Sequence, residues 1–294
     1  MHQSHSRRSR LRLGAGLACA LLLPCALTAQ SFLQNAQGFS VLVENNLNNL
    51  NNSTIFGLTG VGGNISGNNS SLGSGLSGSE SPLQLGGINN ANNFTFLGSG
   101  AIIAPVTPIT DLFNTGPNAL DQASMDLVAL GGTVVTPSGG ALTFAGGAGQ
   151  NVFEVDLNDF NNNNTLNIFV PTASDSVIIN VVNSGASANI QNKTFNLTGA
   201  ATAENVLLNF AGGFAEVVNI GGVIPATILA PDSDAVNLNN SNIGGQLIVE
   251  QINNANGTMF VGTAFVPEPS TYAAIFGGVV FVLAIGRRLF LRRY

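Results

Sequence analysis

The feature that most constrains the fold is a series of short apolar runs at nearly even spacing in the second half of the chain. The runs, rich in Val, Ile, Leu and Phe, are residues 166–170, 177–182, 206–210, 216–220, 227–230, 236–238, 246–249 and 258–261. From Leu207 onward their centres recur about every ten or eleven residues, separated by Gly, Pro, Asp or Asn. Short strands at even spacing are typical of a sandwich, a barrel or a solenoid.

Asparagine favours the solenoid among these architectures, because it tolerates left-handed turns and its amides can stack as ladders along successive coils. We therefore predict a mainly β body with a β-solenoid architecture, and a β-sandwich is the alternative. In the first half of the chain, residues 39–43, 94–97 and 101–104 resemble strands, and residues 61–65 resemble a tight bend into another strand. Residues 66–82 are nearly all Ser, Gly and Asn, so they are predicted to form a loop.

Residues 117–130 are the one segment with helical character. The segment lacks Gly, and Pro117 suits a first helical turn. Its predicted apolar side consists of Leu120, Met125, Leu127 and Val128. We expect Asp121 and Asp126 to point outward, Gly131 to end the helix, and the helix to cap or flank the solenoid.

Several of these segments together resemble the bacterial choice-of-anchor A domain. They are residues 39–43 and 61–65, the helix, and residues 151–156, 205–210, 224–231 and 241–246. The resemblance covers most of residues 39–265, and residues 66–82 and 161–164 look like loop expansions. It implies a β-helical surface domain that is paired with an anchor, and some members of that family are described as collagen-binding or adhesive. It supplies no binding residue.

The chain ends in a segment with three parts in a fixed order. First come Val266, Pro267, Glu268, Pro269, Ser270 and Thr271; next an uncharged apolar run over residues 272–285; then Arg287, Arg288, Arg292 and Arg293. The apolar run falls just short of the roughly 17–20 residues that span a bilayer, and arginine snorkelling or local thinning can absorb the deficit. We predict a single transmembrane helix with the arginines in the cytoplasm and everything before Pro267 outside.

This segment resembles the PEP-CTERM sorting signal of Gram-negative bacteria that make exopolysaccharide. The resemblance implies export, transient retention in the membrane, and processing near residues 267–269 by an exosortase. A plain C-terminal anchor that is never cut is the alternative. The predicted organisation is therefore a signal peptide over residues 1–29, a β-rich extracellular domain over residues 30–265, and a sorting signal over residues 266–294.

The amino terminus also predicts export. Arg7, Arg8, Arg10 and Arg12 precede an apolar stretch over residues 13–23, and a small-residue stretch reaches Ala29, the expected cleavage site. Both histidines and both cysteines lie in this segment, the chain has no Trp, and the only tyrosines are Tyr272 and Tyr294. Removing the signal would exclude disulfides, Ser-His-Asp or Cys-His nucleophiles, and zinc, copper or haem sites of ordinary ligands.

Charge restricts the partners. All fifteen acidic residues lie from Glu44 to Glu268, and Lys193 is the single base outside the two arginine clusters, so the exported part would carry a net charge of −14. Such a surface repels phosphate backbones, so nucleic-acid binding is not expected, and no basic patch for an anionic polysaccharide can form. The expected partners are a processing enzyme of the exosortase type, the membrane, and an exopolysaccharide or matrix protein.

Acidic residues in turns leave calcium open as a ligand, although no cofactor is required. The candidates are Glu154, Asp156, Asp159, Asp232 and Asp234. Turn stabilisation explains the same residues without a metal.

We predict a structural or adhesive protein in an exopolysaccharide or biofilm matrix, with no enzymatic activity. An extracellular β-helical carbohydrate-active enzyme that uses paired carboxylates is the alternative, although it would lack the usual aromatic platforms. An ice- or crystal-binding solenoid face would need regular threonine ladders, which Thr107, Thr110, Thr133 and Thr136 do not supply.

Overall fold

The computed structural model describes residues 33–265, except residues 117–118, 184 and 212–214. The chain divides into two compact units, and all described residues belong to the unit formed by residues 30–270. The predicted signal peptide and most of the predicted sorting signal lie in neither this unit nor the described part. Within the described residues, no helix has the length and apolar character needed to cross a membrane.

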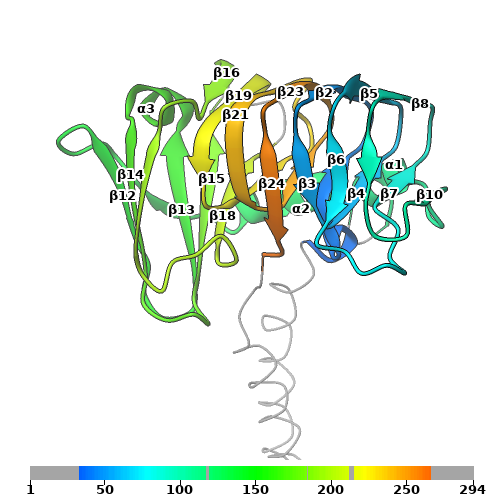
Figure 1. Ribbon diagram of the computed structural model, residues 1–294. Coiled ribbons are helices and arrows are strands. Elements are labelled where there is room, and N and C mark those ends of the chain that lie inside the picture. Colours follow the sequence, from blue (N-terminus) through cyan, green and yellow to red (C-terminus); the bar gives the residue numbers. More distant parts are fainter. Residues whose placement is uncertain (1–32, 117–118, 184, 212–214, 266–294) are drawn as a thin grey trace, which may run out of the picture. The chain divides into compact units, whose positions relative to one another are not determined.

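The described body is a β-solenoid whose strands pair in parallel from coil to coil (Figure 1). This confirms the predicted architecture, and the alternative β-sandwich, built from antiparallel sheets, is wrong. The ten-stranded sheet contains, in spatial order, β10 (Ile102–Ile103), β7 (Leu83–Leu85), β4 (Leu58–Val61), β1 (Phe39–Val43), β22 (Leu247–Val249), β20 (Thr227–Ala230), β18 (Val206–Phe210), β15 (Ser176–Val182), β13 (Gln150–Asp156) and β11 (Thr133–Val134).

Two further sheets complete the solenoid. The eleven-stranded sheet contains β8 (Asn89–Asn92), β5 (Ile65–Asn68), β2 (Leu47–Asn51), β23 (Ile252–Asn256), β21 (Ala235–Gly245), β24 (Met259–Thr263), β3 (Thr54–Phe56), β6 (Ser71–Ser74) and β9 (Thr95–Phe96), with β19 (Ala215–Ile224) and β16 (Gly185–Asn189) joined through β21. The three-stranded sheet contains β12 (Ala141–Ala145), β14 (Thr165–Val170) and β17 (Thr194–Gly199).

The eleven-stranded sheet bends to form two faces. The first half of β21 pairs with β23 and its second half pairs with β24, and the bend between the halves lies near Asn240. Strand β19 follows the same bend and shifts register between Gly221 and Gly222. Each complete coil therefore places one strand in the ten-stranded sheet, one before the bend and one after it.

The chain does not wind through the solenoid in a single direction. It starts in the middle with β1–β3, adds β4–β6 and β7–β9 toward one end, and crosses to the other end through its helices. It then returns coil by coil, and the last coil, β22–β24, stacks in parallel on the first: β22 on β1, β23 on β2 and β24 on β3 (Figure 1). The first and last coils thus close the solenoid in its middle.

A buried glutamine joins the two ends of the described chain. The Gln246 side-chain nitrogen donates to the carbonyl oxygens of Ala36 (2.8 Å) and Phe39 (2.6 Å), beside the short 3₁₀ helix η1 (Gln34–Ala36). The Gln246 side-chain oxygen accepts from the backbone nitrogen of Phe265 at 3.4 Å. The chain therefore enters and leaves the solenoid at the same corner.

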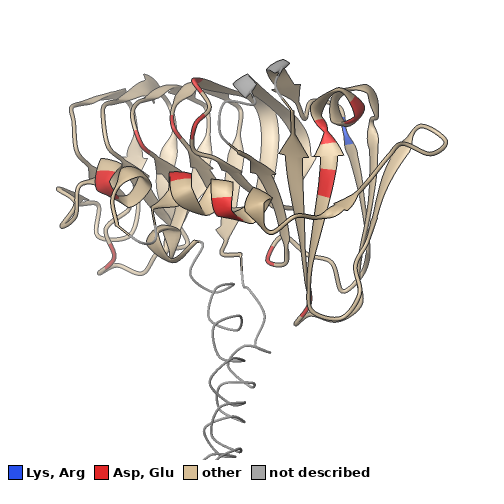
Figure 2. Cartoon of the chain, turned by 180° about the vertical axis from the view of Figure 1, so that it is seen from behind, with Lys and Arg blue, Asp and Glu red and all other residues tan. Residues whose placement is uncertain are grey.

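Helices cover the outer side of the ten-stranded sheet (Figure 2). They are α1 (Ile109–Asn114) and α2 (Leu120–Ala129), whereas α3 (Leu157–Asn162) lies beside β13 and β16. Outward residues of the sheet, including Leu42, Ile178, Leu207, Leu229 and Ile248, form one buried cluster with Leu120 and Leu127 of α2. Because these strands are buried on both faces, their sequences are nearly continuous apolar runs.

The predicted helix is confirmed as α2, and Gly131 follows it with a φ of 65°. Two details of the prediction are wrong. Met125 is exposed, and Ala123 and Ser124 face the sheet in its place, because the helix is rotated to bury its small residues. Asp121 does not point outward but is half-buried near other carboxylates. The two six-residue helices α1 and α3 were not predicted; α3 ends within the asparagine tract at residues 161–164.

The predicted loop over residues 66–82 is also wrong in its first half. Strands β5 and β6 occupy residues 65–68 and 71–74, and only the rest of the segment forms turns. These strands are rich in Ser, Gly and Asn because they pair with β2, β3, β8 and β9 by backbone hydrogen bonds and bury only Ile65 and Leu72 as large apolar residues. Low apolar content therefore did not indicate a loop.

Candidate binding surface

The part of the eleven-stranded sheet before the bend carries asparagines that align across neighbouring coils. One row has an asparagine on each of five adjacent strands: Asn92, Asn68, Asn51, Asn256 and Asn239. A second row, two residues earlier on its strands, contains Asn254, Asn237, Asn219 and Asn189. Neighbouring strands lie about 4.8 Å apart, so each row repeats at that spacing. We call these two rows the amide face.

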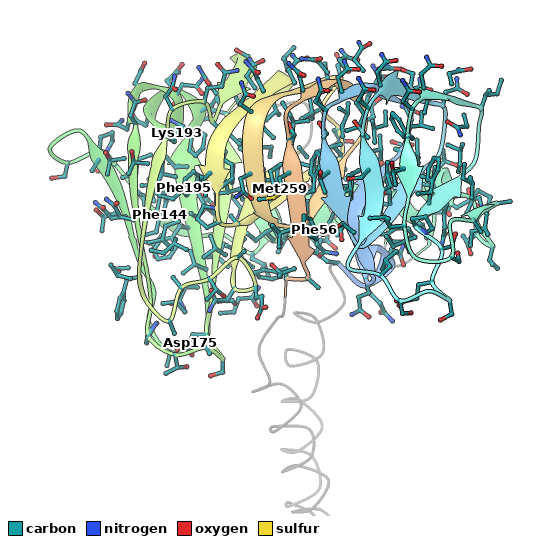
Figure 3. The ribbon with its side chains drawn as sticks, in the orientation of Figure 1. Phe56, Phe144, Asp175, Lys193, Phe195 and Met259 are labelled. Atoms are coloured by element: carbon teal, nitrogen blue, oxygen red, sulfur yellow. The ribbon has the colours of Figure 1, made fainter. Side chains whose placement is uncertain are left out.

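The amide face is directed away from the core. All its side chains are exposed or half-exposed, while the residues between them on the strands, such as Leu50, Leu238 and Ala255, are buried. Asn68 donates to the side-chain oxygen of Asn51 at 3.4 Å, and Asn237 donates to that of Asn219 at 3.3 Å. Figure 3 shows side chains tipped with nitrogen and oxygen along this side of the solenoid. Because an amide has both donors and acceptors, bonds along a row leave further capacity for a ligand.

The amide face ends at the bend, where successive coils place a residue with positive φ. Asn52, Asn69 and Asn93 have φ of 49°, 54° and 54°, and Asn240 has a φ of 46°. In the last coil Gly257 takes the same position with a φ of 60°. Left-handed backbone disfavours most side chains, whereas glycine and asparagine accept it. The prediction that asparagine serves left-handed turns is therefore confirmed.

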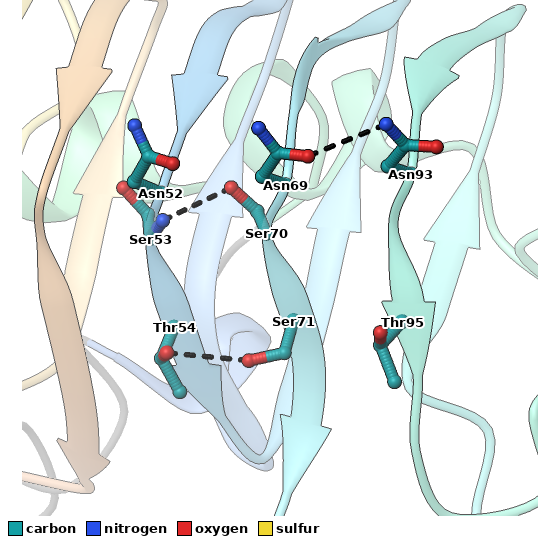
Figure 4. Close-up of a pocket in the computed structure, with 8 residues that line it drawn as sticks. All are labelled: Asn52, Ser53, Thr54, Asn69, Ser70, Ser71, Asn93 and Thr95. Atoms are coloured by element: carbon teal, nitrogen blue, oxygen red, sulfur yellow. Dashed lines mark hydrogen bonds between the residues drawn. The ribbon is translucent and has the colours of Figure 1, made fainter.

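A shallow groove of about 430 Å³ follows this corner across β1–β3, β4–β6 and β7–β9 (Figure 4). On one side lies the amide row, which we define as Asn52, Asn69 and Asn93. On the other side lies the hydroxyl row, which we define as Thr54, Ser71 and Thr95. Asn93 donates to the side-chain oxygen of Asn69 at 3.3 Å, and the Ser71 hydroxyl donates to that of Thr54 at 3.2 Å.

Buried serines form the floor of the groove. Ser53 and Ser70 are 2% and 3% exposed. The Ser70 hydroxyl donates to the carbonyl oxygen of Leu50 (2.9 Å) and accepts from the backbone nitrogen of Ser53 (3.0 Å). The Ser53 hydroxyl donates to the carbonyl oxygen of Asn51 at 2.9 Å. These hydroxyls satisfy the backbone at the bend, so the polar groups that remain for a ligand are those of the two rows.

Neither the groove nor the amide face contains a charged side chain. Lys193, predicted to be the only base of the exported part, is buried and donates to the carbonyl oxygens of Phe160 and Asn163. Its ammonium nitrogen also lies 4.5 Å from the centre of the Phe160 ring. Burial lowers the pKa of Lys193 to about 8. Lys193 therefore stabilises the end of α3 and supplies no surface charge.

Carboxylates gather instead where α2 meets the turns that follow the ten-stranded sheet (Figure 2). Burial raises the pKa of Asp121 to about 7, and neighbouring charges add to this rise. Those neighbours are Asp232, Glu44 and Glu250. Burial also raises the pKa of Glu44 and of Glu250, because the charged carboxylate loses hydration there.

The calcium candidates fall into two separate places. Asp232 and Asp234 follow β20, whereas Glu154 and Asp156 lie on β13 and Asp159 in α3. Strands β13 and β20 are three spacings apart in the sheet, or about 14 Å. Asp156 accepts from the Asn158 backbone and the Asn183 side chain, and these bonds lower its pKa. Among the described residues, no three His, Cys, Asp or Glu side chains form a group that could hold a metal ion.

The sequence analysis expected asparagine ladders but did not identify the residues that form them, although a local signal marks these residues. The pattern Asn-Asn-Ser occurs at residues 51–53, 68–70 and 239–241, and residues 92–93 and 256–258 carry the variants Asn-Asn and Asn-Gly-Thr. Thr110 and Thr133 lie in α1 and β11 and form no ladder together. The aligned hydroxyl residues are instead the hydroxyl row and the pair Thr165 and Thr194. The sorting residues 266–271 and the terminal arginines lie outside the described residues.

Comparison with known proteins links the chain to one family. Residues 80–260 match the family model described as "Putative Ice-binding-like adhesive domain". No curated protein matches the chain at a significant level.

Three solved structures are similar at low sequence identity. An ice-binding protein from the Antarctic ascomycete Antarctomyces psychrotrophicus is 13% identical, with a TM-score of 0.40, over 78% of this chain and 96% of that chain. An ice-binding protein from an Antarctic biological consortium is 13% identical, with a TM-score of 0.38, over 79% and 90%. A glycosylated ice-binding protein from an Arctic yeast is 16% identical, with a TM-score of 0.40, over 83% and 97%.

Proposed function

Because the chain belongs to the ice-binding-like adhesive domain family, we propose that it is an exported adhesive protein without enzymatic activity. It acts at the bacterial surface or in the surrounding matrix and attaches there to a neutral, hydroxyl-rich polymer. The observation that carries this proposal is the amide face, a regular array of uncharged donors and acceptors on adjacent strands.

The chemistry of the amide face supports a polysaccharide as the partner. An amide can donate to one hydroxyl and accept from another, so the face suits a polymer that repeats hydroxyl groups. A single hydrogen bond contributes only about 0.5–1.5 kcal/mol net, so useful adhesion requires many bonds at once. A rigid array supplies them with little loss of conformational entropy, because the strands are fixed before binding. Nucleic acids and anionic polysaccharides do not fit, because the exported part would carry a net charge of −14.

The terminal segments suggest how the protein reaches that place. Val266 to Thr271, the apolar run and the arginines resemble a PEP-CTERM signal, and the body resembles a choice-of-anchor A domain. On this basis an exosortase processes the chain near residues 267–269 after transient retention in the membrane of a Gram-negative bacterium. The described body ends at Phe265, at the corner held by Gln246, which lies on another side of the solenoid from the amide face. No cofactor is needed for adhesion of this kind.

Adhesion of cells that display the chain tests the proposal. Cells expressing the full chain should be retained on films of neutral polysaccharide and not on films of anionic polysaccharide or on bare supports. The test variant replaces Asn237, Asn254 and Asn256 by Asp, which keeps side-chain size but adds charge to the amide face. We expect this variant to be displayed normally and to lose retention. Equal retention of both chains, or retention on the anionic film alone, would contradict an adhesive role of the amide face.

A further inference from the structure

We propose that the corner groove is a binding site for a single chain of neutral glycan that lies across three coils. The inference rests on the proposed function and deepens it, because it names a second, separate site beside the amide face. The ligand would run along the solenoid axis between the amide row and the hydroxyl row (Figure 4).

The groove offers polar atoms that the protein leaves unused. The amide row makes one internal bond, from Asn93 to Asn69, and the hydroxyl row makes one, from Ser71 to Thr54. Within the described residues, the side-chain amide of Asn52, the amide nitrogen of Asn69 and the hydroxyl of Thr95 have no hydrogen-bond partner. The floor serines, by contrast, are engaged with the backbone. A ligand would therefore be bound by the sides of the groove.

The geometry suits a linear chain. Each coil contributes one amide on one side and one hydroxyl on the other, and strands β3, β6 and β9 hold the hydroxyl row in register. Coils repeat at about 4.8 Å, so successive units of a ligand meet the same pair of groups. Hydroxyl groups on a glycan can accept from the amide nitrogens and donate to the amide and hydroxyl oxygens.

The groove has a definite length because the amide row and the hydroxyl row both end at the same coil. In the next coil along the axis, Gly257 replaces the asparagine and Met259, in register with Thr54, replaces the hydroxyl residue. At the outer coil the floor position is taken by Phe94, which packs partly buried against the core. The site thus extends over the three coils β1–β3, β4–β6 and β7–β9. Affinity should rise with the length of an oligosaccharide until it fills these coils.

The charge of the surroundings selects the ligand. The residues that line the groove are uncharged, and the only base in the described part, Lys193, is buried elsewhere. A carboxylated or sulfated glycan would gain no counter-charge there. A neutral glycan needs no counter-charge, so we expect neutral oligosaccharides to bind and anionic ones not to bind.

The test uses the full chain, purified in a mild detergent, and titrates it with neutral oligosaccharides of increasing length by calorimetry. The amide-row variant is N52G/N69G/N93G. Glycine accepts positive φ and already stands at the equivalent Gly257, so the backbone is retained while three amides are lost. The hydroxyl-row variant is T54V/S71A/T95V. Each variant should raise the dissociation constant about 10-fold or more, as expected for a few lost hydrogen bonds.

Two matched controls make the test specific. N240G removes an asparagine with positive φ at the same bend but beyond the groove, and T165V/T194V removes two in-register hydroxyls from the three-stranded sheet. Both should bind like the unaltered chain. If the unaltered chain adheres to neutral polysaccharide but the two row variants bind as tightly as the controls, the groove is not the site, although the proposed function stands. If the unaltered chain binds no neutral glycan, both proposals fail. If the row variants change only the growth of ice crystals, the glycan assignment is overturned.

Discussion

A buried polar network between α2 and the ten-stranded sheet provides the sharpest prediction about stability. Asn180 and Asn209 are in register on β15 and β18, and both side chains are fully buried. Asn209 donates to the side-chain oxygen of Asn180 and to the carbonyl oxygen of Ser124, both at 2.9 Å, and accepts from the Ser124 hydroxyl at 2.6 Å. Asn180 donates to the carbonyl oxygen of Leu127 at 2.8 Å.

Replacing Asn209 by Leu keeps the branched shape of the side chain but leaves the Asn180 oxygen and the Ser124 hydroxyl without their partner. A buried polar group that loses its hydrogen bond costs about 1–3 kcal/mol. Two such groups, offset in part by the burial of leucine, give an expected loss of about 2–4 kcal/mol in the free energy of unfolding. Replacing all three side chains, in N180L/N209L/S124A, also removes the Asn180 oxygen and the Ser124 hydroxyl, and so should recover part of this loss, reduced by the Leu127 carbonyl that then lacks its donor.

Urea unfolding followed by circular dichroism measures both effects. Tryptophan fluorescence cannot serve, because the chain has no Trp and its two tyrosines lie at residues 272 and 294. The control is T143V, at an exposed position of the three-stranded sheet, which should change stability by less than about 0.5 kcal/mol. A loss below about 0.5 kcal/mol for N209L, or a triple variant less stable than N209L, would refute the network as the link between α2 and the sheet.

Three other predictions follow from charge, metal and sorting. Burial and neighbouring carboxylates raise the pKa of Asp121 to about 7, so the folded state holds its proton more tightly than the unfolded state; stability should therefore fall as pH rises from about 4 to 7. In D121N the melting temperature should change less between about pH 4 and 7. An unchanged slope in this pH range would show that Asp121 is not the cause of the fall. Calcium should not change the melting temperature: for the unaltered chain, and likewise for D156N/D159N, we expect the same value in millimolar calcium and in excess chelator, because the candidate carboxylates do not converge. A rise with calcium that D156N/D159N abolishes would contradict this. Replacing residues 267–269 by alanines should trap an uncut, membrane-held chain, and mass spectrometry that finds Arg293 on released protein would exclude processing.

The fold was predictable where one physical pattern dominates. Strands β15, β18 and β20 appear in the sequence as continuous apolar runs because they are buried between the core and the helices. The positive φ of Asn52, Asn69 and Asn240 follows from the known tolerance of asparagine. Strands β5 and β6 were missed because parallel pairing with neighbouring coils, and not apolar content, fixes them.

The order of the coils could not be predicted. Pairing of β1 with β22 joins residues about 200 positions apart, and no local pattern in either strand encodes that contact. The amide face depends on it, since Asn51 and Asn256 are neighbours only because the last coil stacks on the first. The half-buried state of Asp121 likewise depends on how α2 lies across the turns near Asp232. Residue types at the site were visible in the sequence, but their register was not.

The central claim is that an uncharged array of amides attaches this protein to a neutral polymer. The most direct test is an adsorption isotherm of the full chain on a neutral polysaccharide film, measured at low and at high salt. Because the amide face carries no charge, we expect saturable adsorption that changes little between 0.05 and 1 M salt, where screening lengths fall from more than about 10 Å to about 3 Å. Adsorption that collapses with added salt, or that persists unchanged when Asn237, Asn254 and Asn256 are replaced by Asp, would contradict the account.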